Sequence, residues 1–325
     1  MARSKYTQYR KVVGSLGLRQ LDVYRIEKGR KEILRLQDKR SGKIIIAELP
    51  RPRDEMNLKD LAKNLPYPLK QGLKYIYGPV PSWRLGSSLG IDPISGKDKV
   101  CTFDCIYCQI GKTGRFTKER KIYIPLDEII EELSSLPPVK IDYITFSGRG
   151  EPTLAENLGK IIKAIKTLRK DKIAVLTNSS LMYREDIRED LLLADFVIAK
   201  LDVYSQKSLE AINRPIKEIT FNLILEGIKQ FRFKYKGKMA LQIMFLEENK
   251  GNAKEIAQIA KEINPDEVQI NTPLRPCEIE PLSREKIDAV NEYFKDMNSI
   301  SVYEKEKKEV EPISEEATLK RRGKI

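Results

Sequence analysis

Residues 99–113 read KVCTFDCIYCQIGKT and hold three of the four cysteines in the chain. The three thiols follow the spacing C-x3-C-x2-C at Cys101, Cys105 and Cys108, and Tyr107 precedes the last of them. Three thiolates on one loop suit three irons of a [4Fe–4S] cube, whose fourth iron then has no protein ligand. An open coordination position on a metal centre indicates chemistry rather than scaffolding. We therefore interpret this loop as the centre of an active site.

Two other uses of these thiols fit the sequence less well. Structural zinc needs four ligands, usually two well-separated C-x2-C pairs, and the remaining thiol, Cys277, lies far downstream in the segment PLRPCEIE. Inert buried cysteines are expected even less at such a density. We expect a single cluster with three cysteine ligands that forms without Cys277.

The chain contains no histidine. This excludes Ser-His-Asp and Cys-His nucleophilic catalysis, zinc sites built on His, and haem held by His. A metal therefore has to be held by cysteine, carboxylate or backbone groups. Few cysteines, and no apolar run typical of a signal peptide or a membrane span, make us expect a cytoplasmic protein without disulfides and without membrane contact.

From residue 100 onward, short β-branched runs alternate with amphipathic segments, which predicts a parallel sheet with helices outside it. The predicted strands are 141–147, 172–178, 195–202, 239–246 and 267–272, and the predicted helices are 127–136, 158–168, 221–235, 253–263 and 284–297. A strand entering the cysteine loop brings the count to about six βα units, fewer than the eight of a closed barrel. We predict an α/β fold, a partial (βα)6 barrel with its chemistry at the carboxyl ends of the strands.

The stretch CTFDCIYC, residues 101–108, resembles the signature of the radical S-adenosylmethionine (radical SAM) superfamily, with Tyr107 as its aromatic residue. The resemblance implies one [4Fe–4S] cluster held by Cys101, Cys105 and Cys108, and S-adenosylmethionine (SAM) bound to its fourth iron. It also implies reductive cleavage of SAM to a 5′-deoxyadenosyl radical that abstracts hydrogen from a substrate. The electron is then expected from a donor of flavodoxin or ferredoxin type.

A second stretch, ITFSGRGEPTL at residues 144–154, follows a predicted strand and resembles the GGE-type motif of the same superfamily. Ser147, Gly148 and Gly150 are implied as SAM contacts, because glycine lets the backbone approach a ligand closely. Glu151 is implied as a catalytic and SAM-binding residue that accepts a hydrogen bond from the SAM ammonium group. An ordinary glycine turn after a strand is the alternative for this stretch.

The tips of later predicted strands carry polar residues that the resemblance implies as further cofactor contacts. They are Thr177, Asn178, Lys200, Asp202, Gln242 and Asn271. Tyr107 from the cysteine loop and Asn213 from the segment INRP at 212–215 are implied as contacts as well. By resemblance, Lys200 contacts the SAM carboxylate and Asp202 contacts hydroxyl groups. A structural cap or a solvated polar residue explains any single one of these positions equally well.

Positive charge is concentrated at the start of the chain. Residues 1–75 contain 19 Lys and Arg against 8 Asp and Glu, whereas the remainder is nearly balanced. Either this is a solvated lysine-rich surface, or it binds an anionic partner, most plausibly RNA. The RNA hypothesis names eight basic residues as phosphate contacts: Arg19, Arg25, Lys28, Arg30, Lys31, Arg35, Lys39 and Arg40.

The sequence predicts three regions. Residues 1–75 form a basic extension with two or three strands, joined by turns at 28–29 and 41–42, and helices near 56–63 and 67–75. Residues 76–300 form the radical SAM core, and 301–325 form a charged C-terminal tail. The Gly- and Pro-rich segment 77–93 is expected to be an ordered loop over the site.

Three functions remain open at this point. The segments around 77–93, 147–154 and 268–276 look most like a poorly characterised branch near the wyosine-type tRNA synthetases, which favours RNA, and tRNA in particular, as the substrate. A peptide or protein substrate, as for a glycyl-radical activase, is the alternative. A non-catalytic iron–sulfur electron carrier is the third hypothesis.

Overall fold

The computed structural model describes residues 18–26, 31–38, 44–50, 73–96, 98–137, 139–304 and 308–322. It separates the chain into two compact units, Met1–Leu73 with Glu131–Lys140, and Lys74–Ile130 with Ile141–Ile325. None of the helices described in it has both the length and the apolar character needed to cross a bilayer.

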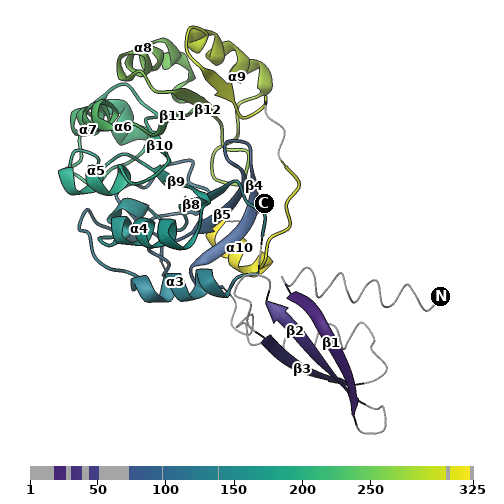
Figure 1. The fold of residues 1–325 in the computed structure, drawn as a ribbon. Helices are drawn as coiled ribbons and strands as arrows, with labels where there is room; N and C mark the ends of the chain where they lie inside the picture. Colours follow the sequence, from purple (N-terminus) through teal and green to yellow (C-terminus); the bar gives the residue numbers. More distant parts are fainter. Residues whose placement is uncertain are drawn as a thin grey trace. The chain divides into compact units, whose positions relative to one another are not determined.

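The smaller unit contains a three-stranded antiparallel sheet in the order β1 (Leu18–Ile26), β2 (Lys31–Asp38) and β3 (Ile44–Pro50) (Figure 1). Leu34 and Leu36 of β2 are fully buried, whereas Arg35, between them, is partly exposed. This alternation is that of a sheet with one covered face. The strands predicted for the basic extension are thereby confirmed, and its predicted helices lie outside the described residues except at 73–75, which are not helical.

The larger unit is built on an eight-stranded sheet with the order β13-β12-β11-β10-β9-β8-β5-β4. The strands are β4 (Ile76–Ser82), β5 (Gly86–Ile91), β8 (Tyr143–Phe146), β9 (Lys172–Thr177), β10 (Phe196–Lys200), β11 (Lys238–Met244), β12 (Glu267–Asn271) and β13 (Ser299–Ser301). Neighbouring strands run parallel except for β4 and β5. The sheet curls into a half-barrel, which confirms the predicted fold class (Figure 1).

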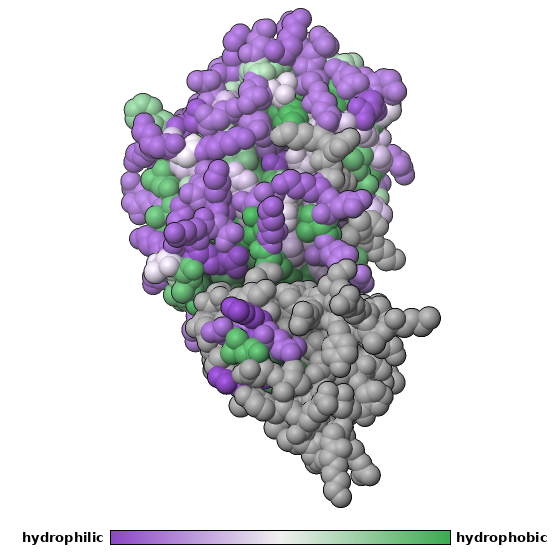
Figure 2. Space-filling view, turned by 45° about the vertical axis from the view of Figure 1, so that its right-hand side comes forward, coloured by the Kyte–Doolittle hydropathy of each residue, from purple (hydrophilic) through white to green (hydrophobic). Residues whose placement is uncertain are grey.

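Helices α4 (Leu158–Leu168), α5 (Glu185–Leu191), α6 (Gln206–Ile212), α7 (Phe221–Lys234), α8 (Ala253–Ile263) and α9 (Arg284–Asn291) cover the outer side of this sheet (Figure 1). Helix α10 (Glu315–Arg322) packs on the edge strand β4. Helix α3 (Leu126–Ser135) is divided between the two units, and the 3-10 turns are η2 (Pro152–Leu154), η3 (Lys250–Asn252) and η4 (Glu292–Phe294). The predictions for α4 and α8 match to the residue. The face of this unit seen in Figure 2 is mostly hydrophilic, with hydrophobic residues in small separate groups.

The prediction of a loop over 77–93 is wrong. This segment forms the antiparallel hairpin β4–β5, and β5 pairs in parallel with β8 as the first barrel strand. Prolines argue against a central strand, but β4 lies at the sheet edge and its pairing is irregular between Tyr77 and Val80, so Pro79 and Pro81 are tolerated there. The predicted helix 284–297 is also shorter, since α9 ends at Asn291 and a 3-10 turn follows.

The end of the described chain packs on this hairpin. The backbone N–H of Ile313 donates to the carbonyl of Gly78 (2.7 Å), and the N–H of Gly78 donates to Thr318 Oγ1 in α10 (3.0 Å). Gly78 and Ser314 also form an isolated antiparallel bridge. Helix α10 therefore belongs to the larger unit and satisfies backbone groups of its edge strand.

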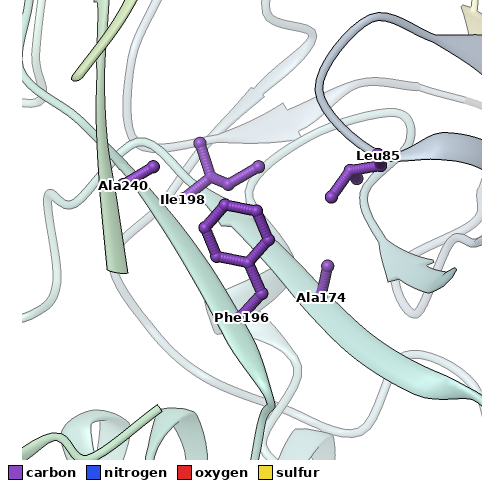
Figure 3. Packing of buried hydrophobic residues seen from close by; sticks show 5 residues of the cluster. All are labelled: Leu85, Ala174, Phe196, Ile198 and Ala240. Atoms are coloured by element: carbon purple, nitrogen blue, oxygen red, sulfur yellow. The ribbon is translucent and has the colours of Figure 1, made fainter. Parts of the chain in front are cut away.

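The inner face of the half-barrel changes character along each strand. At the amino ends it is apolar: Phe196 and Ile198 of β10 pack with Ala174, Ala240 and the side chain of Leu85 from the β4–β5 turn (Figure 3). Because side chains alternate along a strand, the next residues on the same face are Lys200 in β10 and Gln242 in β11. The inner face is therefore apolar at the amino ends of the strands and polar at their carboxyl ends, where the candidate site lies.

The short strand β6 (Val100–Cys101), which pairs with β7 (Arg115–Phe116), carries the first cysteine and touches the motif after β8. The N–H of Val100 donates to the carbonyl of Arg149 (3.2 Å), and the N–H of Glu151 donates to the carbonyl of Val100 (3.1 Å). A Cβ added to Gly150 would lie 1.8 Å from the Val100 oxygen, so only glycine permits this approach.

We predict that Gly150→Ala destabilises the protein by about 1–3 kcal/mol, because the methyl group forces two backbone segments apart. Gly251→Ala is the control, since a Cβ there meets nothing within 4 Å. Thermal unfolding of both variants checks the expectation. Equal melting temperatures for Gly150→Ala and the wild type would contradict the role given to this close contact.

Candidate active site

The cysteine loop follows β5 and β6 and lies near the carboxyl ends of the barrel strands. Cys101 is buried, and Cys105 and Cys108 are partly exposed. The N–H of Cys108 donates to the carbonyl of Cys105 (3.0 Å), and that of Gly111 donates to the carbonyl of Cys108 (3.0 Å). Consecutive turns of this kind hold the second and third thiols at fixed positions along one short loop.

Two of the sulfurs accept hydrogen bonds from asparagine side-chain amides. Asn178 Nδ2, just after β9, donates to Cys101 Sγ at 3.5 Å. Asn213 Nδ2, just after α6, donates to Cys105 Sγ at 3.5 Å. Donors to cysteine sulfur are one of the means by which proteins tune iron–sulfur clusters. Both asparagines were predicted cofactor contacts, and the structure brings both to the cysteine loop.

Lys99 is a further member of this region that the sequence analysis did not single out. Its side chain is 6% exposed, and Nζ donates to the carbonyl of Gly111 (2.9 Å). Burial lowers the pKa of Lys99, but negative charge on Cys108, Cys101 and Cys105 raises it, and the net shift is upward. The Lys99 ammonium group therefore stays charged beside the cysteine loop, where it also lies 3.9 Å from Asp104 Oδ1.

The donor set fits an iron–sulfur cluster. Burial raises the pKa of the Cys101 thiol to about 12 and also raises that of Cys105, so these groups bind metal with release of protons. Among the described residues, no three Cys, Asp or Glu side chains converge into a closed site for a single ion. A cube binds each thiolate through a different iron, so its ligands do not share one point.

Glu151 is buried, with only 2% of its surface exposed. Oε1 accepts from the N–H of Thr153 (3.1 Å), Thr153 Oγ1 (2.7 Å) and Thr177 Oγ1 (2.7 Å). Oε2 accepts from the N–H of Asn178 (2.7 Å). Burial raises the pKa of Glu151, whereas these four donors act in the opposite direction. Glu151 therefore joins the segment after β8 to the end of β9.

A second network joins the cysteine loop to β10. The Tyr107 hydroxyl donates to Asp202 Oδ2 and accepts from Lys200 Nζ (2.8 Å) and Asn213 Nδ2 (3.0 Å). Asn213 Nδ2 also donates to Asp202 Oδ2 (2.9 Å), and the N–H of Met244 donates to Asp202 Oδ1 (2.8 Å). The four residues Tyr107, Lys200, Asp202 and Asn213, all predicted cofactor contacts, thus form one connected group.

The Ser147–Glu151 motif, which follows β8, is also held by Tyr77 of β4 and by Asp92, just after β5. Ser147 Oγ and the Tyr77 hydroxyl are hydrogen bonded at 2.6 Å. Gly148 adopts φ +143°, and a Cβ there would lie 2.4 Å from the Asp92 carboxyl carbon. Asp92 Oδ2 accepts from the N–H of Arg149 (3.2 Å). Ser147, Gly148 and Gly150 therefore lie beside the cysteine loop, close to Glu151 in sequence and in space.

Gln242 and Asn271 are connected less closely. Gln242 lies opposite Lys200 in the β10–β11 register, and Asn271 lies opposite Met244 in the β11–β12 register. Both are buried, yet in the described part of the chain no side-chain hydrogen bond joins either one to the Tyr107 network. The structure places them on the same inner face without assigning them a contact.

Two cavities border the cysteine loop. A small one is lined by Asn178, Lys200, Asp202 and Asn213, together with Cys105. A larger one, about 340 Å³, is lined by Cys105 and Cys108 on one side and by Arg214, Pro276 and Cys277 on the other. Cys277, remote in sequence, therefore faces the same cavity as two of the predicted cluster ligands, and its thiol donates to the carbonyl of Ile279 (3.2 Å).

Comparison with known proteins agrees with this geometry. Residues 99–260 match the profile of the Radical SAM superfamily. A UPF0026 protein of Synechocystis sp. is 44% identical over 211 residues, which cover 65% of this chain and 78% of that protein. A UPF0026 protein of Methanocaldococcus jannaschii is 41% identical over 231 residues, covering 69% and 71%.

Solved structures show the same fold at low sequence identity. A radical SAM methyltransferase from Sphaerobacter thermophilus superposes with a TM-score of 0.50 at 11% identity, covering 93% of this chain and 81% of that one. SuiB of Streptococcus suis bound to SAM gives 0.51 at 15% identity, covering 76% and 55%. Taken with the cysteine loop and the sequence relatives, these matches show that the chain belongs to the UPF0026 proteins of the radical SAM superfamily.

Proposed function

We propose that this protein is a radical SAM enzyme that binds one [4Fe–4S] cluster through Cys101, Cys105 and Cys108. The observation that supports this most strongly is the contact between the cysteine loop and the Ser147–Glu151 motif, through Val100 and Gly150. Two sequence motifs that are separate along the chain meet at one end of the half-barrel. With a cluster and SAM bound, the site would supply an electron that cleaves SAM to 5′-deoxyadenosyl radical.

The chain's own residues hold and orient these groups. Lys99 balances the charge of three thiolates, and Asn178 and Asn213 donate to two of them. Lys200, at 21% side-chain exposure, is accessible to a ligand and in our proposal binds the SAM carboxylate. Asp202, at 2%, is committed to Tyr107, Asn213 and Met244, so we propose that it positions these groups.

RNA, and tRNA in particular, is our proposed substrate class, and the cytoplasm our proposed compartment. The support is the charge of residues 1–75. The strand register refines the set of phosphate contacts: Arg25 lies opposite Glu32 and Arg35 lies opposite Asp22, whereas Arg19 lies opposite Gln37. Arg19 is exposed and has no acidic residue directly across from it, so it is the described residue best suited to a phosphate contact.

Replacing Cys101, Cys105 or Cys108 by Ala is expected to abolish the cluster, because two thiolates cannot hold three irons. Cys277→Ala should keep the cluster, although this thiol faces the same cavity. Iron and sulfide analysis after anaerobic reconstitution measures both outcomes. If Cys277→Ala loses the cluster, the site has four protein ligands and the open iron required for SAM is absent.

Glu151→Ala should keep the cluster, but its affinity for SAM should be about 10- to 100-fold lower. That loss corresponds to one charge-assisted hydrogen bond. Cleavage should fall further, because the displaced Ser147–Gly150 segment no longer aligns SAM. Exposed Glu156→Ala is the matched control. Dithionite-driven formation of 5′-deoxyadenosine is measured, and a rate like that of the wild type in Glu151→Ala would remove Glu151 from the site.

The RNA proposal predicts tRNA binding that weakens steeply with salt, by about 0.9 in log–log slope for each duplex phosphate contact. Arg19→Gln should reduce the magnitude of that slope by about 0.9, the value of one phosphate contact. Lys254→Gln, at an exposed position of α8, should leave the slope unchanged. Anaerobic incubation with SAM, reductant and total tRNA should then give nucleosides of altered mass. Absence of tRNA binding at low salt, with a peptide pool consuming the radical instead, would refute the RNA proposal.

A further inference from the structure

Arg214 adopts a left-handed backbone conformation, with φ at +46°, just after the end of α6. Its N–H donates to the carbonyl of Leu209 (3.0 Å), as at many helix ends where a left-handed residue stops the helix. Glycine is the usual residue in this conformation, because a Cβ is crowded there. Arginine at this position therefore carries a conformational cost that glycine would avoid.

The contacts of this chain reversal involve its backbone and not the arginine side chain. The carbonyls of Asn213 and Arg214 both accept from the N–H of Asp104 in the cysteine loop (3.0 and 3.1 Å). Pro215, the next residue, forms an isolated bridge with Phe103. Glycine could make the same backbone contacts without strain. Because strained residues other than glycine cluster at functional sites, the arginine side chain is the feature that needs a role.

Arg214 is exposed and lines the cavity of about 340 Å³ that also reaches Cys105 and Cys108. Within the part of the chain that the structure describes, no hydrogen bond or ion pair engages its guanidinium group. Lys112 is exposed on the same cavity, and its ammonium group likewise has no partner among the described residues. The rim of the cavity therefore offers two available cations beside the proposed cluster ligands.

Two acidic residues also line this cavity, Asp104 and Glu278. Asp104 is already engaged, because its Oδ1 accepts from the N–H of Thr113 (2.7 Å) and lies 3.9 Å from Lys99 Nζ. Glu278 alone then opposes the two cations, so the rim keeps a positive balance. A ligand with negative charge is favoured there.

We propose that Arg214 binds a phosphodiester group in a single-stranded segment of the RNA substrate, with an unpaired nucleotide of that segment in the cavity. The class of substrate rests on the proposed function. The planar guanidinium fork matches the two free oxygens of a phosphodiester. A volume of about 340 Å³ is that of a site for one small ligand, so a nucleotide has to leave a duplex to reach the cysteines.

Binding of a labelled single-stranded RNA hexamer of random sequence is measured on the full chain without cluster or SAM. Arg214→Gln should weaken binding about tenfold. It should also reduce the magnitude of the log–log salt slope by about 0.7, the value of one phosphate contact in a single strand. A blunt RNA duplex should bind this variant and the wild type alike. Lys254→Gln, at an exposed position of α8, should bind both RNAs like the wild type.

The melting temperature distinguishes this role from a structural one. Arg214→Gly removes the crowded Cβ, so it should melt at least as high as the wild type while losing the same RNA affinity. Asn264→Gly is the matched control, because Asn264 ends α8 at φ +53° and asparagine tolerates that conformation. It should bind RNA like the wild type. A lower melting temperature for Arg214→Gly would indicate a structural role and contradict the proposal.

The remaining outcomes separate this proposal from the proposed function. Wild-type RNA affinity in both Arg214 variants would overturn the Arg214 contact and leave an RNA substrate in place. A loss of duplex affinity equal to that for the single strand would show a general surface cation, and an equal loss of SAM affinity would show a cofactor contact. Either result would refute the proposal. Absence of RNA binding by the wild type at low salt would refute both proposals.

Discussion

The buried carboxylate of Glu151 accepts hydrogen bonds from Thr153, Thr177 and Asn178, and through them it connects two strand ends beneath the cysteine loop. Asn178 in turn donates to Thr102 and to the sulfur of Cys101. Each unsatisfied donor left by loss of the carboxylate would cost about 1–3 kcal/mol, so this group stabilises the junction between the two strand ends. The glycine contact at Val100 completes the same junction and leaves no space for a side chain.

Regular periodicity made much of the fold predictable. Helices α4 and α8 were predicted to the residue because their apolar positions recur at helical spacing over three turns. The β4–β5 hairpin was missed because its prolines and glycines are typical of loops, and only the pairing of strands reveals that β4 is an edge strand. That information depends on tertiary structure and is absent from local sequence.

The same distinction applies to the site. The three cysteines follow from their spacing, and the rule that parallel strands end at one edge predicts where polar strand ends gather. Glu151 and the other cofactor contacts were implied by the resemblance to the radical SAM superfamily. The partners that position them could not be predicted in this way: Lys99, Thr153 and Tyr77 belong to no recognised spacing, although a lysine two residues before a cluster ligand was a usable signal.

Three thiolate ligands would leave one iron of the proposed cluster open to SAM. Electron paramagnetic resonance of the reduced, reconstituted protein can detect this, because a ligand on the open iron changes the spectrum of the cluster. We expect SAM to shift the spectrum of the wild type and of Cys277→Ala alike. A spectrum that SAM leaves unchanged, in a protein with a full complement of iron and sulfide, would contradict an open iron.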